Sequence, residues 1–338
     1  MSERVTLKQV AAKAGISYQT VSKVLNGSNQ VARETAERIL SAARELGYRP
    51  NTMARNLRSQ RSWMIGYSWI PTPPNQVNHI LDLFLTSMVQ EAEAAGYHLL
   101  PFPYQEGEEQ VETYREMIDS GRVDGFVLSS VEYDDPRIQF LLSRQFPFVA
   151  FGRSNPEIDF PYVDIDGGAG MRMTVDYLIK KGHRRIAVLA WPENSRVGND
   201  RMGGFFEALN NAALSIPTEW VMRGEGTYEF GLKSGLHLLS TSPDQRPTAI
   251  VTLNDTQAIG AMVAAHELNL TVGSDVDVIG FDDAPMSQYL YPPLSSIRQP
   301  IREAGRLCVE QLIKLMEGES LIERQILLNP KLIIRASA

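Results

Sequence analysis

Side chains with hydrogen-bonding groups gather at the start of one short amphipathic segment near the N-terminus. Ser17 has a side chain that favours the beginning of a helix. After it come Tyr18, Gln19, Thr20, Ser22 and Lys23. Gln can pair with adenine through two hydrogen bonds, and Lys can reach O6 and N7 of guanine. Hydroxyl groups and helix N-termini hold phosphates, which fix position without reading sequence. The segment therefore predicts a helix that reads base edges, although a solvated polar face is the simpler interpretation of an isolated helix.

The elements around this segment favour the DNA-reading interpretation. Thr6 is a good N-cap for a first helix that Gly15 ends, the second helix stops at Asn26-Gly27, and a third covers about 32–46. The tight turn at 14–17 joins the first two as a helix-turn-helix. Because each apolar stripe is too narrow to be buried alone, the three helices must pack on one another.

Charge is distributed unevenly along the 338 residues. Residues 1–62 hold eleven Lys and Arg against four acidic residues, a net charge of +7, whereas the remainder carries −14. A basic head on an acidic body suits a protein that meets phosphates at one end only.

The segment VTLKQVAAKAGISYQTVSKVLN at 5–26 resembles the headpiece of the lactose/galactose-repressor family. GYRPN at 47–51 followed by MARNL at 53–57 resembles its hinge, and the similarity covers essentially the whole chain. The resemblance implies a ligand-controlled transcription regulator, with Tyr18, Gln19 and Lys23 at base-reading positions. The expected DNA-binding residues are Thr6, Ser17, Tyr18, Gln19, Thr20, Ser22, Lys23, Asn26, Ala54, Arg55 and Leu57.

The composition of the hinge at 51–62 also indicates how this segment could bind DNA. A stretch of about ten mostly polar residues is marginal as an isolated helix in water. Leu57 lies among arginines, which suits an apolar wedge that kinks DNA from the minor groove. An ordinary linker is the alternative, and the family resemblance favours the wedge.

From residue 63 onward, short apolar runs alternate with amphipathic segments. Predicted strands cover 65–68, 98–102, 126–129, 148–151, 186–190, 220–222, 249–253, 277–281 and 332–334. Predicted helices cover about 80–95, 110–120, 136–144, 170–181, 201–211, 229–239, 256–267 and 301–316. This alternation predicts α/β architecture with parallel sheets covered by helices, and its length exceeds one core.

The expected fold class is therefore an all-α headpiece at 1–50, the hinge, and a two-lobed α/β domain at 63–338. The resemblance implies a type I periplasmic-binding-protein fold for that domain. Its first lobe is expected at about 63–164 and 296–326, and its second at about 165–295 and 327–338.

Polar and aromatic residues follow several predicted strands, where open α/β sheets bind ligands. Aromatic faces combined with carboxylate, amide and guanidinium groups suit a sugar, which presents C–H faces ringed by hydroxyls. Each residue also has a plainer interpretation, such as core packing for Trp69 or helix capping for Asp255. In sugar-binding relatives the positions matching Arg201, Asn254 and Asp282 bind ligand hydroxyls, and that of Tyr228 stacks on the ring. The expected effector residues are Trp69, Asp164, Arg201, Tyr228, Asn254, Asp282 and Gln299.

Other functions find less support. The sequence has no G-x-G-x-x-G, P-loop, G-x-S-x-G or HExxH motif, so catalysis, a cofactor or a metal is not expected. A stand-alone sugar-binding protein of an importer is disfavoured by the headpiece and by the lack of a signal-peptide pattern. A regulator that senses a purine or another metabolite stays open as the alternative.

Composition indicates where the protein works and how it assembles. No apolar run approaches the ~18 residues that a membrane helix needs. Cys308 is the only cysteine, which excludes an internal disulfide and fits the cytoplasm. The additional C-terminal heptad helix that makes one member of the resembling family a tetramer is not expected after 332–334. We therefore expect a homodimer whose paired headpieces read a pseudo-palindromic DNA operator.

Overall fold

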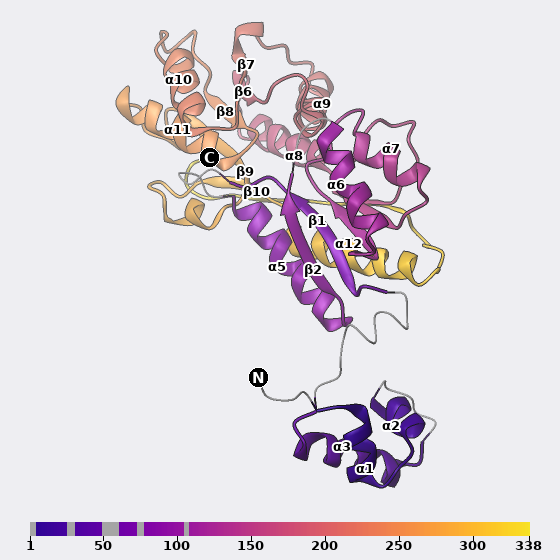
Figure 1. Cartoon of the computed structure of the whole chain (residues 1–338). Helices are drawn as coiled ribbons and strands as arrows, with labels where there is room; N and C mark the ends of the chain where they lie inside the picture. Colours follow the sequence, from indigo (N-terminus) through magenta and orange to yellow (C-terminus); the bar gives the residue numbers. More distant parts are fainter. Residues whose placement is uncertain (1–4, 26–30, 49–60, 73–77, 105–107) are drawn as a thin grey trace. The chain divides into compact units, whose positions relative to one another are not determined.

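The computed structural model describes residues 5–25, 31–48, 61–72, 78–104 and 108–338 (Figure 1). The chain divides into two compact units, Met1–Ser62 and Trp63–Ala338.

The first unit is the predicted three-helix headpiece, with α1 (Leu7–Ala14), α2 (Tyr18–Leu25) and α3 (Arg33–Glu45). Thr6 caps α1 in a reciprocal arrangement with Gln9, and Gly15 ends the helix at φ 63°. Val10, Val21 and Ile39, one from each helix, are fully buried in the common core. The helix-turn-helix prediction is confirmed.

The second unit contains two sheets, and the first is wholly parallel. It has the order β11-β5-β4-β3-β1-β2. Its strands are β1 (Met64–Trp69), β2 (His98–Pro103), β3 (Gly125–Leu128), β4 (Phe148–Phe151), β5 (Tyr162–Ile165) and β11 (Gln325–Leu328). Alternate strand residues pack against opposite layers: α5 (His79–Ala94) and α12 (Ile301–Met316) cover one face. The other face is covered by α6 (Glu108–Asp119) and α7 (Pro136–Ser143).

The second sheet has the order β12-β10-β9-β8-β6-β7, and only the pairing of β12 with β10 is antiparallel. Its strands are β6 (Ile186–Ala190), β7 (Val221–Arg223), β8 (Ala249–Thr252), β9 (Asp277–Asp282), β10 (Ser295–Arg298) and β12 (Lys331–Ile333). One face is covered by α8 (Gly167–Lys180) and α9 (Arg196–Asn211), and the other by α10 (Tyr228–Leu239) and α11 (Asp255–Glu267).

The chain passes between the two sheets at three places: between β5 and α8, between β10 and α12, and between β11 and β12. We call the layers around the first sheet lobe 1 and those around the second sheet lobe 2. Strand β10 belongs to lobe 2, so the second passage follows Arg298, whereas the sequence placed residues from 296 onward in lobe 1. Because the parallel strands of each lobe end at their carboxyl edges, the loops that follow them can form a ligand site.

Candidate nucleic-acid-reading helix and effector cavity

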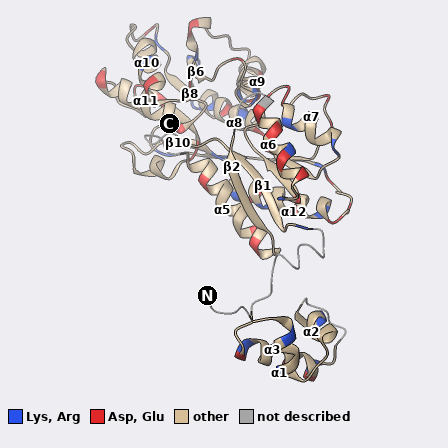
Figure 2. Cartoon of the chain, in the orientation of Figure 1, with Lys and Arg blue, Asp and Glu red and all other residues tan. Residues whose placement is uncertain are grey.

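Helix α2 presents the predicted base-reading side chains to solvent. Tyr18 is 45% exposed, and Gln19 and Lys23 are exposed as well. Thr20 is half-buried, and its hydroxyl and amide lie 2.8 Å and 3.2 Å from the Ser17 hydroxyl, which caps the helix start. Helices α1 and α2 carry lysines and no acidic residue, and the acidic residues of the described headpiece helices are all on α3 (Figure 2).

Ser22 differs from the prediction. The sequence placed it on the outward face of α2, but it is only 7% exposed because it follows Val21 on the side that packs into the headpiece core. Thr6 is exposed, and its hydroxyl is engaged with Gln9 in the cap of α1. The predicted DNA contacts Asn26, Ala54, Arg55 and Leu57 lie outside the described residues.

A cavity of about 900 Å³ lies between the lobes, lined by loops and helix starts from both. Apart from Trp69, every predicted effector residue lines it: Asp164, Arg201, Tyr228, Asn254, Asp282 and Gln299. Trp69 ends strand β1 and packs against the apolar core of lobe 1, which fits its plainer interpretation, and its effector role stays a prediction. The sequence also placed Arg201 at the opening of its helix, whereas α9 begins at Arg196.

Arg201 lines the cavity and packs against two aromatic rings, of which that of Trp191 also lines the cavity whereas that of Phe281 is fully buried. Its guanidinium carbon lies 4.8 Å from the centre of the Trp191 ring and 3.7 Å from that of Phe281. One of its terminal nitrogens donates to the Leu253 carbonyl. Burial lowers the pKa of the Arg201 guanidinium, and the nearby Asp282 carboxylate opposes that shift. Among the described residues, Arg201 Nε and Trp191 Nε1 are buried donors without a hydrogen-bond acceptor. Such donors are rare in folded proteins, and here they belong to residues of a ligand-sized cavity.

Asp282 and Gln299 form the facing polar pair. The Gln299 amide donates to Asp282 Oδ1 at 2.7 Å. Burial raises the pKa of Asp282 to about 7, and the charge on Arg201 opposes this rise. The backbone of Asp282 has φ 109°, which an L-residue rarely adopts, so the surrounding structure must hold it in place. The carboxylate of Asp282 can accept hydrogen bonds from ligand hydroxyls, and the amide of Gln299 can donate to them.

The capping role that the sequence suggested for Asp255 belongs to Asn254. Asn254 is the N-cap of α11. Its side-chain Oδ1 accepts a hydrogen bond from the backbone amide of Gln257, and its side-chain Nδ2 donates one to the backbone carbonyl of Gly226. Asp255 is buried and accepts from Ser287, Ser296 and the Ala284 amide. Asn254 thus lines the cavity mainly as a support for the loop before Tyr228.

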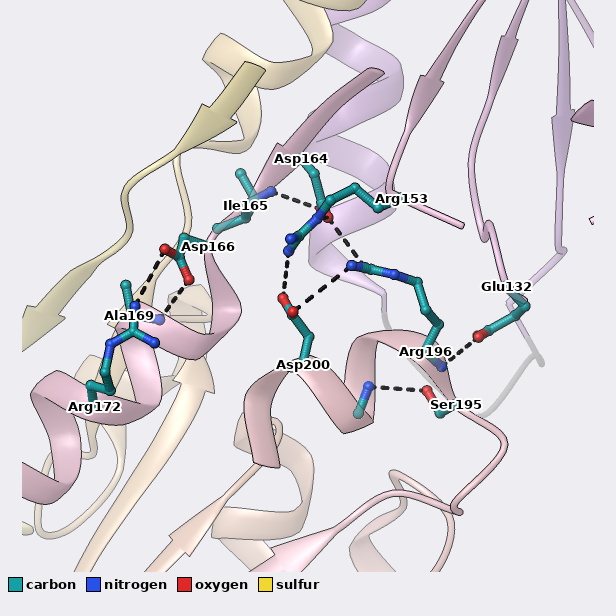
Figure 3. Close-up of polar contacts among 11 residues, drawn as sticks. Glu132, Arg153, Asp164, Ile165, Asp166, Ala169, Arg172, Ser195, Arg196 and Asp200 are labelled. Carbon is teal, nitrogen blue, oxygen red and sulfur yellow. Dashed lines mark hydrogen bonds and ion pairs between the residues drawn. The ribbon is translucent and has the colours of Figure 1, made fainter. Parts of the chain in front are cut away.

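Asp164 lies in β5 rather than after it, and its carboxylate is already engaged. Oδ1 accepts from the Ile165 amide at 2.8 Å, while Oδ2 lies 2.7 Å from Arg153 and 3.3 Å from Arg196 (Figure 3). Both carboxylate oxygens of Asp164 are therefore already paired, which leaves little capacity to accept a hydrogen bond from an effector.

Sequence reasoning missed several residues of this region. Trp191 directly follows the predicted strand at 186–190, so the rule that selected the other strand-end residues would have found it. Arg153 lies two residues after the predicted strand at 148–151, so the same rule could have selected it. Arg196 and Asp200 had no such signal, and the pairing of the three residues joins segments that are distant in sequence.

The described residues contain no group of three or more His, Cys, Asp or Glu arranged to hold a metal ion. A search of the same residues for a helix long and apolar enough to cross a membrane also found none.

Comparison with known proteins supplies the family. A family model described as "Bacterial regulatory proteins, lacI family" matches residues 6–51, and one described as "Periplasmic binding protein-like domain" matches residues 175–338. The HTH-type transcriptional repressor PurR of Salmonella paratyphi B is 31% identical over 334 residues, which are 98% of this chain and 96% of that protein.

Solved structures agree in fold. A regulatory protein of the LacI family from Chloroflexus aggregans is 64% identical, with a TM-score of 0.79 over 82% of this chain and 98% of that one. The regulator CelR in complex with cellobiose is 30% identical, with a TM-score of 0.74 over 99% of this chain and 100% of that one. The lac repressor dimer bound to operator and the anti-inducer ONPF is 28% identical, with a TM-score of 0.84 over 99% of each chain.

These similarities cover the headpiece and both lobes, and the relatives are transcription regulators rather than enzymes. The chain therefore belongs to the lacI family of bacterial regulatory proteins and is a DNA-binding transcriptional repressor with a two-lobed periplasmic-binding-protein-like domain.

Proposed function

We propose that this repressor binds a sugar in the cavity between its lobes and that the sugar changes its affinity for an operator. The observation that carries the proposal is the cavity of about 900 Å³, which brings the Asp282–Gln299 pair together with Arg201. These polar groups can exchange hydrogen bonds with ligand hydroxyls, and Tyr228 adds an aromatic surface for a C–H face.

The size of the cavity suits this class of ligand. Its volume of about 900 Å³ is near the upper end of the ~300–1,000 Å³ typical of small-molecule sites. The similarity to a regulator solved with cellobiose supports a saccharide. The similarity to a repressor named PurR keeps a purine as the competing ligand.

At the DNA end, we propose that Tyr18, Gln19 and Lys23 read base edges, because they are the exposed side chains at the start of α2. Thr6, Ser17, Thr20 and Asn26 are proposed phosphate contacts. The proposed hinge contacts are Ala54, Arg55 and Leu57. A homodimer, as in the lac repressor–operator structure, would place two headpieces on a pseudo-palindromic operator.

A thermal-unfolding screen of the full-length protein tests the ligand class. The panel contains monosaccharides, oligosaccharides and purines at graded concentrations. A true ligand at 100 times its Kd stabilises the protein by ~2.7 kcal/mol. Asp282→Asn preserves the shape of the side chain and should reduce the shift for a saccharide. If only purines stabilise the protein, the effector is a purine and not a sugar. If the stabilisation by a saccharide is the same in Asp282→Asn as in the wild type, the saccharide does not bind in the assigned cavity.

A further inference from the structure

Four charged side chains form a closed ring across the two lobes (Figure 3). Arg153 Nε lies 2.7 Å from Asp164, and Arg153 Nη2 lies 2.5 Å from Asp200. Arg196 closes the ring, at 3.3 Å from Asp164 and 3.8 Å from Asp200. Each arginine thus contacts both aspartates. We call these residues the interlobe ring.

The ring is divided evenly between the lobes. Arg153 follows β4 and Asp164 lies in β5, both in lobe 1, whereas Arg196 and Asp200 lie on α9 of lobe 2. Within each lobe the arginine contacts the aspartate, and two further contacts, Arg153–Asp200 and Arg196–Asp164, cross between lobes. The side chains are 7–27% exposed, so the pairs are shielded from most of the solvent.

A further hydrogen bond crosses between the lobes beside the ring. The backbone amide of Arg196, the first residue of α9, donates to Glu132 Oε2 of lobe 1 at 2.6 Å. A carboxylate at a helix N-terminus is also favoured by the helix dipole. Glu132 therefore holds the start of the helix that carries Arg196, Asp200 and Arg201.

This arrangement has a property that a simple structural ion pair lacks. If the lobes separate, each lobe retains one arginine and one aspartate that already contact one another, so no isolated charge is left behind. Losing one partner of a buried pair is strongly unfavourable, whereas losing contacts between two neutral pairs costs much less. The closed and open arrangements can therefore lie close enough in free energy for a ligand to shift their populations.

We propose that the interlobe ring holds the lobes in the closed arrangement and thereby determines effector affinity, with Arg153 as a positioning residue. Asp164, Arg196 and Asp200 line the cavity, but Arg153 does not. Arg153 acts through its contacts with Asp164 and Asp200, which hold these two lining residues in place. The inference rests on the proposed function in one respect: it takes the cavity between the lobes as the effector site.

The Arg196 amide gives a readout of lobe closure that needs no effector. Amide hydrogen exchange at single-residue resolution, on the full-length protein without ligand, compares Arg196 with Gly198. The Gly198 amide donates to Ser195 within the same helix turn, so it does not depend on lobe 1. Arg153→Met and Asp200→Asn should each accelerate exchange at Arg196 by at least about fivefold, the low end of allosteric couplings. Gly198 should change little.

The double variant distinguishes the ring from general weakening. Each single change leaves one uncompensated charge, whereas Arg153→Met with Asp200→Asn leaves the neutral cross-lobe pair Arg196–Asp164. The double variant should therefore accelerate exchange less than the product of the two single effects. Arg153→Lys keeps the charge but loses the fork that reaches both aspartates, and it provides an intermediate case if Arg153→Met unfolds. Arg172→Met with Glu207→Gln is the matched control, because this 2.9 Å pair joins α8 to α9 within lobe 2.

Effector titration is the second arm. With the saccharide from the thermal screen, the single ring variants should bind at least about fivefold more weakly than the control pair. Unchanged exchange at Arg196 in Arg153→Met, Arg153→Lys and Asp200→Asn would overturn the ring. Accelerated exchange in a protein that binds no saccharide or purine would support the ring and count against the proposed function.

Discussion

Single side chains on α2 are expected to carry the preference of the repressor for its operator. Gln19→Ala and Lys23→Ala should each cost ~1–3 kcal/mol on the cognate operator and relax the preference at one base pair, because each removes a contact with base edges. Binding to a set of operators with single base changes, measured by fluorescence anisotropy at fixed salt, checks this.

The matched control is Lys8→Ala on α1, which removes the same charge from another exposed lysine of the headpiece. It should weaken binding to every sequence about equally. If Gln19→Ala left the ranking of operator variants unchanged, α2 would not read bases in the proposed way.

Asp282 is expected to make the stability of the effector domain depend on pH. Its pKa rises from an ordinary 3.8 to about 7 because it is buried, despite the charge on Arg201. Between these values the unfolded chain has lost the proton that the folded protein retains. The free energy of unfolding should therefore fall as pH rises from about 4 to about 7, by at most ~1.4 kcal/mol per pH unit for this group.

Asp282→Asn should flatten that dependence. It should not remove it, since burial also raises the pKa of Asp255, to about 6. Urea unfolding of both proteins at several pH values provides the measurement. Equal slopes for wild type and Asp282→Asn would show that Asp282 keeps an ordinary pKa in the folded protein.

At the scale of elements, the position of α9 depends on its close approach to α8. A methyl group on Gly204 of α9 would lie 2.0 Å from the backbone oxygen of Gly168 on α8. Gly204→Ala should therefore force the helices apart, destabilise the protein by about 1–3 kcal/mol and weaken effector binding through displaced Arg201.

The neighbouring Gly203 provides a direct control, because nothing lies within 4 Å of a methyl group there. Gly203→Ala should stabilise the protein by about 0.5–1 kcal/mol, since Gly is a poor helix residue. Chemical denaturation of both variants tests the pair. Equal effects would mean that the close approach of the helices does not position α9.

Much of this architecture follows from local patterns. Periodicity predicted all the α-helices that the structure describes in the two lobes, α9 to within five residues and the others to within three, since each has an apolar stripe or a cap. Strands β5, β10 and β11 were missed: each has four residues and borders a passage between the lobes. The Asp255 carboxylate accepts hydrogen bonds from three donors that are distant in sequence. The sequence could not show these contacts, and it therefore suggested Asp255 instead of Asn254 as the cap of α11.

The cavity residues were predictable in part for the same reason. Side chains near the ends of predicted strands meet at one edge of a sheet, and this rule pointed to Arg201, Tyr228 and Asp282, whose ligand roles came from the family resemblance. Gln299 follows a strand that was not predicted, so the resemblance alone placed it in the site. The interlobe ring follows no local rule. Arg153 and Asp200 are 47 residues apart in sequence, and their pairing depends on how two separate sheets face each other.

At the scale of the whole molecule, the proposed regulation couples the cavity between the lobes to helix α2 of the headpiece. A ligand can alter operator affinity only by the difference between its affinities for the DNA-competent and incompetent arrangements. Typical couplings of this kind are ~1–3 kcal/mol, or ~5–150-fold, and they are reciprocal. The interlobe ring joins lobe 1 to lobe 2, and a ligand in the cavity can shift the populations of the closed and open arrangements of these lobes.

The most direct test of this central claim is a reciprocal titration. Operator affinity is measured with and without the saccharide found by the thermal screen, and saccharide affinity is measured with and without operator. For the wild type we expect the two affinities to change by the same factor of ~5–150. For Asp282→Asn we expect the saccharide response to be lost and operator binding to be retained. A saccharide that binds in the cavity while operator affinity stays the same would contradict the account.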